Sequence, residues 1–190
     1  MHVDSLPAAQ SGGLCINAYA QPNTENLARM TAERERTATE LELATRIQAD
    51  ALPNVFPAFP EHGEFSIFAS MTPAKEVGGD FYDFFLIDET HLGIVMADVS
   101  GKGVPAALFM MSARTLIRSF AKTEKSPAQI MEAVNNTICE QNNREFMFVT
   151  VWFGILDLSA GSITAVNAGH EHTALMPAGY AAVSQAEIEI

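Results

Sequence analysis

The sequence predicts an α+β fold in which layered antiparallel β-sheets are flanked by a pair of helices. Three observations lead to this prediction. Short apolar runs separated by turn residues occur on both sides of the chain's centre, two helical segments follow each other between them, and a charged helical segment precedes them all. Consecutive strands joined by tight turns favour antiparallel pairing. With 190 residues, 48% of them apolar, the chain can bury a substantial core.

The N-terminal part of the chain divides into a tail and a helix. Residues 1–24 mix Ser, Gly, Pro, Asn and Gln without a sustained period, so we expect an irregular tail there. Residues 25–52 contain neither Gly nor Pro and are followed by Pro53, which predicts a helix. Its charged side chains recur three or four positions apart, as on an exposed helix: Glu33, Arg36, Glu40, Glu42 and Arg46.

Two interpretations of this helix stay open. Four apolar residues fit the core positions of a heptad repeat: Leu27, Met30, Leu41 and Ala44. They would make residues 25–52 a linker that dimerises or transmits a signal. Arg34 and Thr37 occupy the intervening core positions and weaken that interpretation. The alternative is a solvated helix that docks only its last turns.

A domain is predicted at residues 53–190. Pro53, Pro57 and Pro60 indicate an extended connection into it. Alternating apolar residues then predict a half-buried strand, and two further strands follow around a turn: Phe65, Ile67 and Ala69 for the first, residues 81–87 and 92–97 for the pair, and residues 88–90 for the turn. These segments indicate an antiparallel meander.

Two consecutive helices and a second group of strands complete the domain. Pro105 suits the first turn of a helix that runs to about residue 122. Ser126 and Gln129, with Pro127 between them, form the pattern of a capped helix start. Three strands are expected after this helix, with a turn at residues 159–161: residues 148–158, 162–167 and 173–176.

Composition excludes several classes of function. The formal net charge of −12 argues against a nucleic-acid backbone or an anionic membrane as the main partner. Cys15 and Cys139 lack the spacing of a metal site, which favours a reducing, cytoplasmic location over a disulfide framework. Apolar runs are far shorter than the roughly 20 residues that cross a bilayer, so no membrane span is expected. The first residues do not resemble a secretion signal.

Two acidic motifs suggest a metal site. GGDFYD at residues 78–83 places Asp80 after two glycines, and ADVSGKG at residues 97–103 places Asp98 at the end of an apolar run. Either aspartate alone could be a turn former or a helix cap. Carboxylate oxygens are nevertheless the ligands that hard divalent cations prefer. Two aspartates on neighbouring strands could share one site.

Together with two later segments, these motifs resemble a known family. FVTVWFGILDL at residues 148–158 and NAGH at residues 167–170 follow them in matching order. The set resembles the PPM-type metal-dependent protein phosphatases, in particular their bacterial SpoIIE-like branch, across most of residues 40–176. The helix that ends in ELELATRIQADALP resembles the linker that joins this branch to upstream sensors.

The resemblance implies dephosphorylation of phosphoserine or phosphothreonine by water activated between two divalent cations, Mn²⁺ or Mg²⁺. It implies that Asp98 bridges both ions, that Val99 offers its backbone carbonyl, and that Asp80 is a ligand. The supporting positions that it implies are Gly78, Gly79, Asp83, Gly101, Gly103 and His170. His170 and His172 lack the further Cys or His of a zinc site.

The resemblance also implies partners and a difference from the family. The expected substrate is a phosphorylated regulatory protein such as an anti-sigma factor antagonist, the upstream partner is a sensor, and a homodimer is possible through the linker helix. The family pattern continues to a Thr-Asp-Gly stretch whose aspartate completes the metal site, whereas no Asp follows Asp157 here. We therefore expect either a fragment or a shortened relative. The alternative function is a catalytically impaired or inactive binding module.

Overall fold

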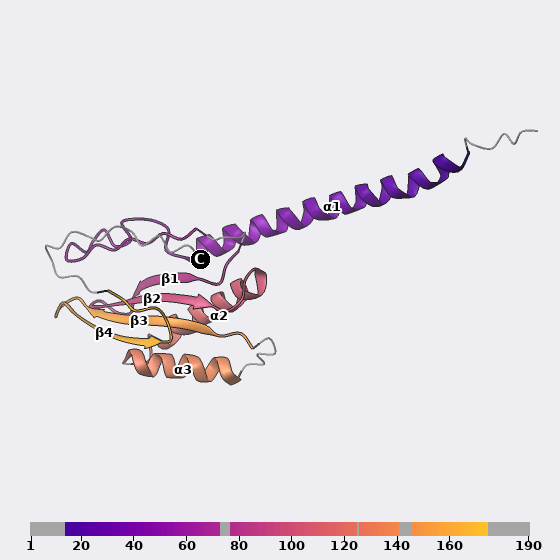
Figure 1. Ribbon diagram of the computed structural model, residues 1–190. Helices are drawn as coiled ribbons and strands as arrows, with labels where there is room; N and C mark the ends of the chain where they lie inside the picture. The colour runs from indigo at the N-terminus through magenta and orange to yellow at the C-terminus, as the bar shows by residue number, and fades with distance from the viewer. Residues whose placement is uncertain (1–13, 73–76, 125, 141–145, 175–190) are drawn as a thin grey trace, which may run out of the picture. The chain divides into compact units, whose positions relative to one another are not determined.

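The computed structural model describes residues 14–72, 77–124, 126–140 and 146–174. It contains two compact units, residues 1–42 and residues 43–190. The first described element is the long helix α1, Leu14–Ala51, whose C-terminal turns belong to the second unit. The rest of the second unit holds the sheet and the other helices (Figure 1).

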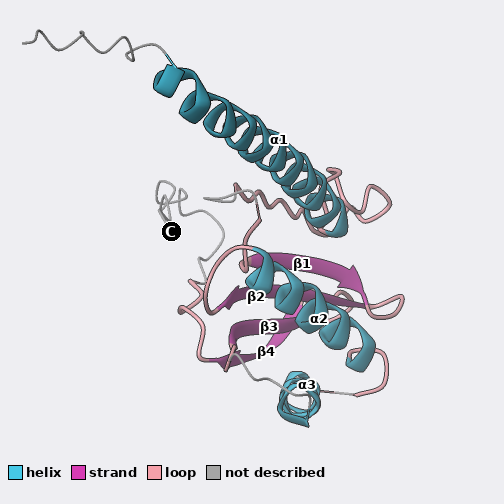
Figure 2. Cartoon of the chain, turned by 90° about the vertical axis from the view of Figure 1, so that its right-hand side faces the viewer, coloured by secondary structure: helices cyan, strands magenta, loops and turns pink. Residues whose placement is uncertain are grey.

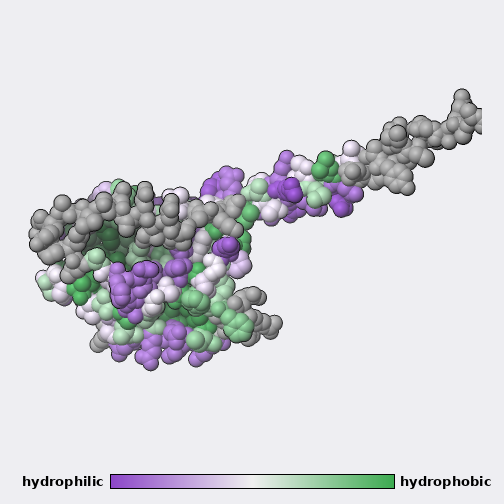
Figure 3. Space-filling model, viewed as in Figure 1, coloured by the Kyte–Doolittle hydropathy of each residue, from purple (hydrophilic) through white to green (hydrophobic). Residues whose placement is uncertain are grey.

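Helix α1 begins earlier than the sequence predicted. We expected an irregular tail over residues 1–24, yet the helix starts at Leu14 and passes through Pro22. The prediction rested on the mixture of Ser, Gly, Pro, Asn and Gln in residues 1–24, but both glycines of that stretch, Gly12 and Gly13, precede α1. In the first unit, the described part of α1 carries mostly hydrophilic residues, as Figure 3 shows in purple. Residues 1–13 of the expected tail lie outside the described residues.

The sheet has four strands in the order β1-β2-β3-β4, and each neighbouring pair is antiparallel. The strands are β1 (Phe81–Leu86), β2 (His91–Val99), β3 (Val149–Asp157) and β4 (Ser162–Ala168). Helices α2 (Val104–Phe120) and α3 (Pro127–Glu140) connect β2 to β3. They lie side by side on one face of the sheet (Figure 2). This arrangement confirms the predicted α+β class, the antiparallel pairing and the helix pair.

The main core lies between the sheet and the two helices. Alternate strand residues face α2 and α3 and are almost fully buried, among them Val95, Val99, Val151 and Phe153. The predicted start of α3 is confirmed, because the Gln129 backbone N–H donates to the Ser126 hydroxyl oxygen at 3.3 Å. This core fixes the positions of the strand ends that carry the acidic motifs.

The opposite face of the sheet is partly covered by the connection that follows α1. Tyr82, Phe84 and Leu92 form a second cluster there, and apolar side chains of the connection pack on them: Phe56, Ala58, Phe59, Phe65, Ile67, Ala69 and Met71. Tyr82 also donates a hydrogen bond from its hydroxyl to the Pro53 carbonyl at 2.8 Å. Figure 1 shows this connection on the side of the sheet away from α2 and α3.

The predicted strand at Phe65, Ile67 and Ala69 is wrong, although the alternation behind the prediction is real. These residues are half-buried and their neighbours Ser66 and Phe68 are exposed, but the described chain forms no ladder in this segment. One side of the extended segment packs on the Tyr82 cluster, which produces a period of two without a paired backbone. Of the expected last strand, residues 173–174 are not in a strand and residues 175–176 lie outside the described residues.

No helix in the described part of the chain is both long enough and apolar enough to cross a membrane.

Candidate metal centre

Asp80 and Asp98 meet at one end of the sheet. Asp80 directly precedes β1, and Asp98 is the penultimate residue of β2. The antiparallel register pairs Phe81 with Ala97, which places Asp80 opposite Asp98. Because side chains alternate along a strand, both carboxyl groups lie on the face away from α2 and α3. The structure therefore brings together the two aspartates that the sequence singled out.

The two carboxyl groups interact directly. Burial, a hydrogen bond with Asp98 and the charge of Asp98 together raise the pKa of Asp80 to about 6. Two carboxylates this close repel each other, so Asp80 keeps its proton to a higher pH than an isolated aspartate does, and a bound cation would offset the repulsion. A pair of oxygen ligands of this kind fits a hard cation such as Mn²⁺ or Mg²⁺.

Gly79 brings the first motif against the second. A Cβ atom at Gly79 would lie 2.8 Å from the Cβ of Val99, 2.9 Å from the Val99 carbonyl oxygen and 3.2 Å from the Cβ of Ala106. Only glycine fits this close approach of two backbones. The Val99 carbonyl, which the resemblance implies as a ligand, therefore lies beside the segment that carries Asp80.

The turn after β2 depends on two glycines with positive φ. Gly101 has φ 89° and Gly103 has φ 74°, a region that residues with side chains rarely adopt. Ser100 in this turn forms two hydrogen bonds with Phe148, the residue before β3. Ser100 N donates to the Phe148 carbonyl, and Phe148 N donates to the Ser100 hydroxyl, both at 2.9 Å. These contacts fix the end of β2, where Asp98 lies.

His170 contacts Thr150, the residue of β3 that lies opposite Asp98. Thr150 is the register partner of Asp98 on β3. Its hydroxyl lies 3.0 Å from Nδ1 of His170 and 3.5 Å from the Asp98 carbonyl oxygen. Asn167 shapes the loop, because its side chain accepts a hydrogen bond from His170 N at 2.8 Å and donates to the His170 carbonyl at 3.0 Å. Sequence reasoning missed Thr150, since a threonine in a strand is ordinary.

Asp83, which we expected to support the metal ligands, faces the other side of the sheet. Its side chain is only 1% exposed and forms ion pairs with Arg114 and Arg118 of α2. The strand alternation contained the signal, because a residue three positions after Asp80 must point to the opposite face. Asp83 therefore joins β1 to α2 and does not approach the Asp80 and Asp98 pair.

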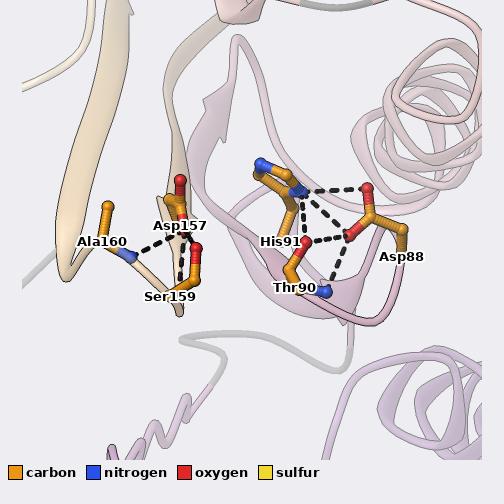
Figure 4. A network of polar contacts seen from close by, with 6 residues as sticks. All are labelled: Asp88, Thr90, His91, Asp157, Ser159 and Ala160. Carbon is orange, nitrogen blue, oxygen red and sulfur yellow. Dashed lines mark hydrogen bonds and ion pairs between the residues drawn. The ribbon is translucent and has the colours of Figure 1, made fainter.

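Two further aspartates shape turns at the other end of the sheet (Figure 4). Asp88 accepts a hydrogen bond from Thr90 N at 2.8 Å and contacts Nδ1 of His91 at 2.9 Å, and these bonds lower the pKa of Asp88 to about 2. Asp157 accepts hydrogen bonds from Ser159 and Ala160, which lower its pKa. The turns predicted at residues 88–90 and 159–161 are confirmed. Their carboxylates serve local structure.

The centre that the structure describes contains two acidic side chains. Within the described ranges, no group of three or more His, Cys, Asp or Glu residues is placed to hold a metal ion. The resemblance assigns ligand roles to Asp80, Asp98 and the Val99 carbonyl. Of these, the two carboxylates meet, and the carbonyl lies beside Gly79.

Comparison with known proteins decides the family. Residues 88–187, more than half of the chain, match the Stage II sporulation protein E (SpoIIE) family. The chain belongs to the SpoIIE family. The resemblance to SpoIIE-like PPM-type phosphatases is thereby confirmed. A solved structure, the SiaA-PP2C domain of Pseudomonas aeruginosa, aligns with this SpoIIE-family chain at a TM-score of 0.55 and 26% identity, over 67% of the chain and 51% of that domain.

Curated relatives of the SpoIIE-family chain are longer. Protein IcfG of Synechocystis sp. is 35% identical over 70% of the chain and 24% of its own length. Phosphoserine phosphatase RsbU of Bacillus subtilis is 33% identical over 70% of the chain and 38% of its own length. Phosphoserine phosphatase RsbP of Bacillus subtilis is 31% identical over 70% of the chain and 33% of its own length. The chain thus spans about a quarter to two fifths of these relatives.

Proposed function

We propose that this chain hydrolyses phosphoserine or phosphothreonine on a regulatory protein, with two divalent cations, Mn²⁺ or Mg²⁺, as cofactors. The observation that carries the proposal is the meeting of Asp80 and Asp98 at the ends of two paired strands, where burial, a hydrogen bond with Asp98 and the charge of Asp98 together raise the pKa of Asp80 to about 6. Family membership and the phosphoserine phosphatases RsbU and RsbP among its relatives support the reaction class.

Each residue of the centre has a distinct proposed task. Asp98 and Asp80 would hold the cations through their carboxylates, and Val99 would add its backbone carbonyl. When bound, the cations lower the pKa of a water molecule and offset charge on the phosphoryl group. Thr150 and His170 would hold the strand end next to Asp98. The carboxyl groups of Asp80 and Asp98 both lie on the face of the sheet away from α2 and α3.

The proposal can be tested with the purified chain. We expect Mn²⁺-dependent release of phosphate from a phosphoserine peptide, and we expect Asp98→Asn to remove it, because an amide cannot replace a bridging carboxylate. Asp88→Asn is the matched control, since an asparagine can still accept the Thr90 hydrogen bond in the distant turn. Equal rates for wild type and Asp98→Asn would reject the assignment. Binding of a partner without any Mn²⁺ binding would favour a non-catalytic module.

We also propose that residues 25–52 link an upstream sensor to the phosphatase domain at residues 53–190, in the cytoplasm, and that this linker can dimerise. Leu27 and Met30 are 65% and 51% exposed on α1, which leaves apolar surface available for a second helix. Light scattering would compare the wild type with a Leu27→Glu, Met30→Glu variant. A wild-type monomer across the concentration range would contradict the dimer.

A further inference from the structure

Gln48 is a buried polar residue in the last turns of α1. Its side chain is 5% exposed, although glutamine is normally found at the surface. Both ends of its carboxamide are used by one residue far along the chain. Nε2 donates to the Gly78 carbonyl at 2.6 Å, and Oε1 accepts from the Gly78 backbone N–H at 3.1 Å. Gln48 thus replaces the hydrogen bonds that a neighbouring strand would give to Gly78.

Gly78 and Gly79 are held from two sides. Gln48 holds Gly78, while Gly79 is packed so closely against Val99 and Ala106 that it has no space for a Cβ atom. Asp80 is the next residue. The segment therefore has little freedom to move by itself, and a displacement of the C-terminal turn of α1 would displace Gly78 with it.

We propose that Gln48 is a positioning residue, which holds the Gly78–Gly79 segment so that Asp80 stays opposite Asp98 for cation binding. This inference rests on the proposed function, because it concerns the same pair of carboxylates. The affinity of the centre for cations then depends on the last turn of α1.

A purely structural role for Gln48 would make a different prediction. Leu52 is also buried, at 6% exposed, in the core beside the end of α1. Leu52→Ala would weaken packing there without removing either hydrogen bond to Gly78. Gln48→Met keeps much of the side-chain volume but has no donor for the Gly78 carbonyl and only a weak acceptor, the thioether sulfur, for the Gly78 N–H. The two variants therefore separate general docking of the helix from positioning of Gly78.

The experiment is calorimetric titration of the full chain with Mn²⁺, after thermal melting has shown that each variant is folded. We expect Gln48→Met to weaken Mn²⁺ binding about tenfold, as loss of a group that orients a metal ligand commonly does. Leu52→Ala should bind Mn²⁺ within about twofold of wild type despite an equal or larger loss of thermal stability. Hydrogen exchange at the Gly78 amide should be faster only in the Gln48 variant.

The possible outcomes distinguish the two proposals. Wild-type Mn²⁺ affinity in a folded Gln48→Met variant overturns the positioning role and leaves the proposed function intact. An equal loss of affinity in Leu52→Ala also overturns it, because helix docking alone would then explain the effect. Absence of Mn²⁺ binding by the wild type overturns the proposed function, and the inference with it. If Gln48→Met does not fold, Gln48→Asn, which shortens the side chain by one methylene, is measured against the same criteria.

Discussion

Asp83 of β1 and Arg118 of α2 form a two-point ion pair across the core. Arg118 donates from Nε to Oδ2 and from Nη2 to Oδ1 of Asp83, each at 2.6 Å. Arg114 is close as well, with 3.0 Å between its Nε and Oδ2 of Asp83, but that N–H is not directed at the carboxylate. The guanidinium of Arg118 also lies 4.6 Å from the ring centre of Phe85. Strand and helix are thus joined by a charge-assisted contact.

Removing Asp83 should strongly destabilise the fold. Asp83→Ala leaves the partly buried Arg114 and Arg118, whose side chains are 15% and 36% exposed, without their counter-charge, so we expect the free energy of unfolding to fall by about 3 kcal/mol. Arg118→Met should cost less, since Arg114 still faces Asp83. Urea denaturation measures both. A loss below about 1 kcal/mol for Asp83→Ala would contradict a buried ion pair.

Mn²⁺ affinity should change by less than about twofold in Arg118→Met, because this pair lies on the other face of the sheet.

The raised pKa of Asp80 predicts how the metal-free chain responds to pH. The pKa is about 6 in the folded chain against an ordinary value of 3.8, so the folded state binds this proton more tightly than the unfolded state does. Between these values the unfolded chain has released a proton that the folded chain keeps. The free energy of unfolding therefore falls as pH rises through this window and receives no further change from Asp80 above it.

Thermal melts in a chelator check this dependence. The fall in melting temperature between about pH 4 and pH 7 should be smaller in Asp80→Asn than in wild type, because the amide does not titrate. Comparing the two chains cancels the general effect of the high negative charge. Identical pH profiles would show that Asp80 has an ordinary pKa.

Local signals explain what the sequence predicted well. Pro105 and the Ser126-Pro127 pair mark helix starts through contacts within one turn, so α2 and α3 were located closely. Asp80 was singled out because it follows two glycines, and Asp98 because it ends an apolar run; the strand register then placed them together.

Contacts between distant segments explain what the sequence did not predict. The carboxamide of Gln48 holds Gly78, and Thr150 contacts His170, across separations of 30 and 20 residues. Neither contact produces a helical or strand periodicity that could be recognised in the sequence. Asp83 was misplaced for another reason, since family resemblance drew attention to its motif when the strand period already pointed it toward α2.

Divalent cations should stabilise the folded chain. A ligand that binds only the native state at about 100 times its dissociation constant adds about 2.7 kcal/mol to the free energy of unfolding. We therefore expect Mn²⁺ to raise the melting temperature at pH 7, and Asp80→Asn to abolish that increase. Asp157→Asn is the control, because Asp157 accepts its hydrogen bonds in a turn at the far end of the sheet. Equal increases in all three chains would indicate cation binding elsewhere.

The Thr150 hydroxyl should matter more than its methyl group. Thr150→Val has nearly the same shape but cannot bond to Nδ1 of His170, so we expect a loss of about 1 kcal/mol in the free energy of unfolding and a lower rate of phosphate release. Thr150→Ser keeps the hydroxyl and should retain the rate. Steady-state kinetics on a phosphoserine peptide compare the two variants. If valine and serine behave alike, the contact with His170 does not support the centre.

Gly79 offers a steric test of the same centre. In Gly79→Ala the new Cβ would lie 2.8 Å from the Cβ of Val99, closer than carbon atoms tolerate, so the backbone next to Asp80 must shift. Overpacking of this kind costs about 1–3 kcal/mol, and the shift should also weaken Mn²⁺ binding. Gly63→Ala is the matched control, because no atom lies within 4 Å of its added Cβ. Urea denaturation and calorimetry should therefore separate the two alanine variants, and a Gly79→Ala chain with wild-type stability and Mn²⁺ affinity would show that the two motifs do not need this close approach.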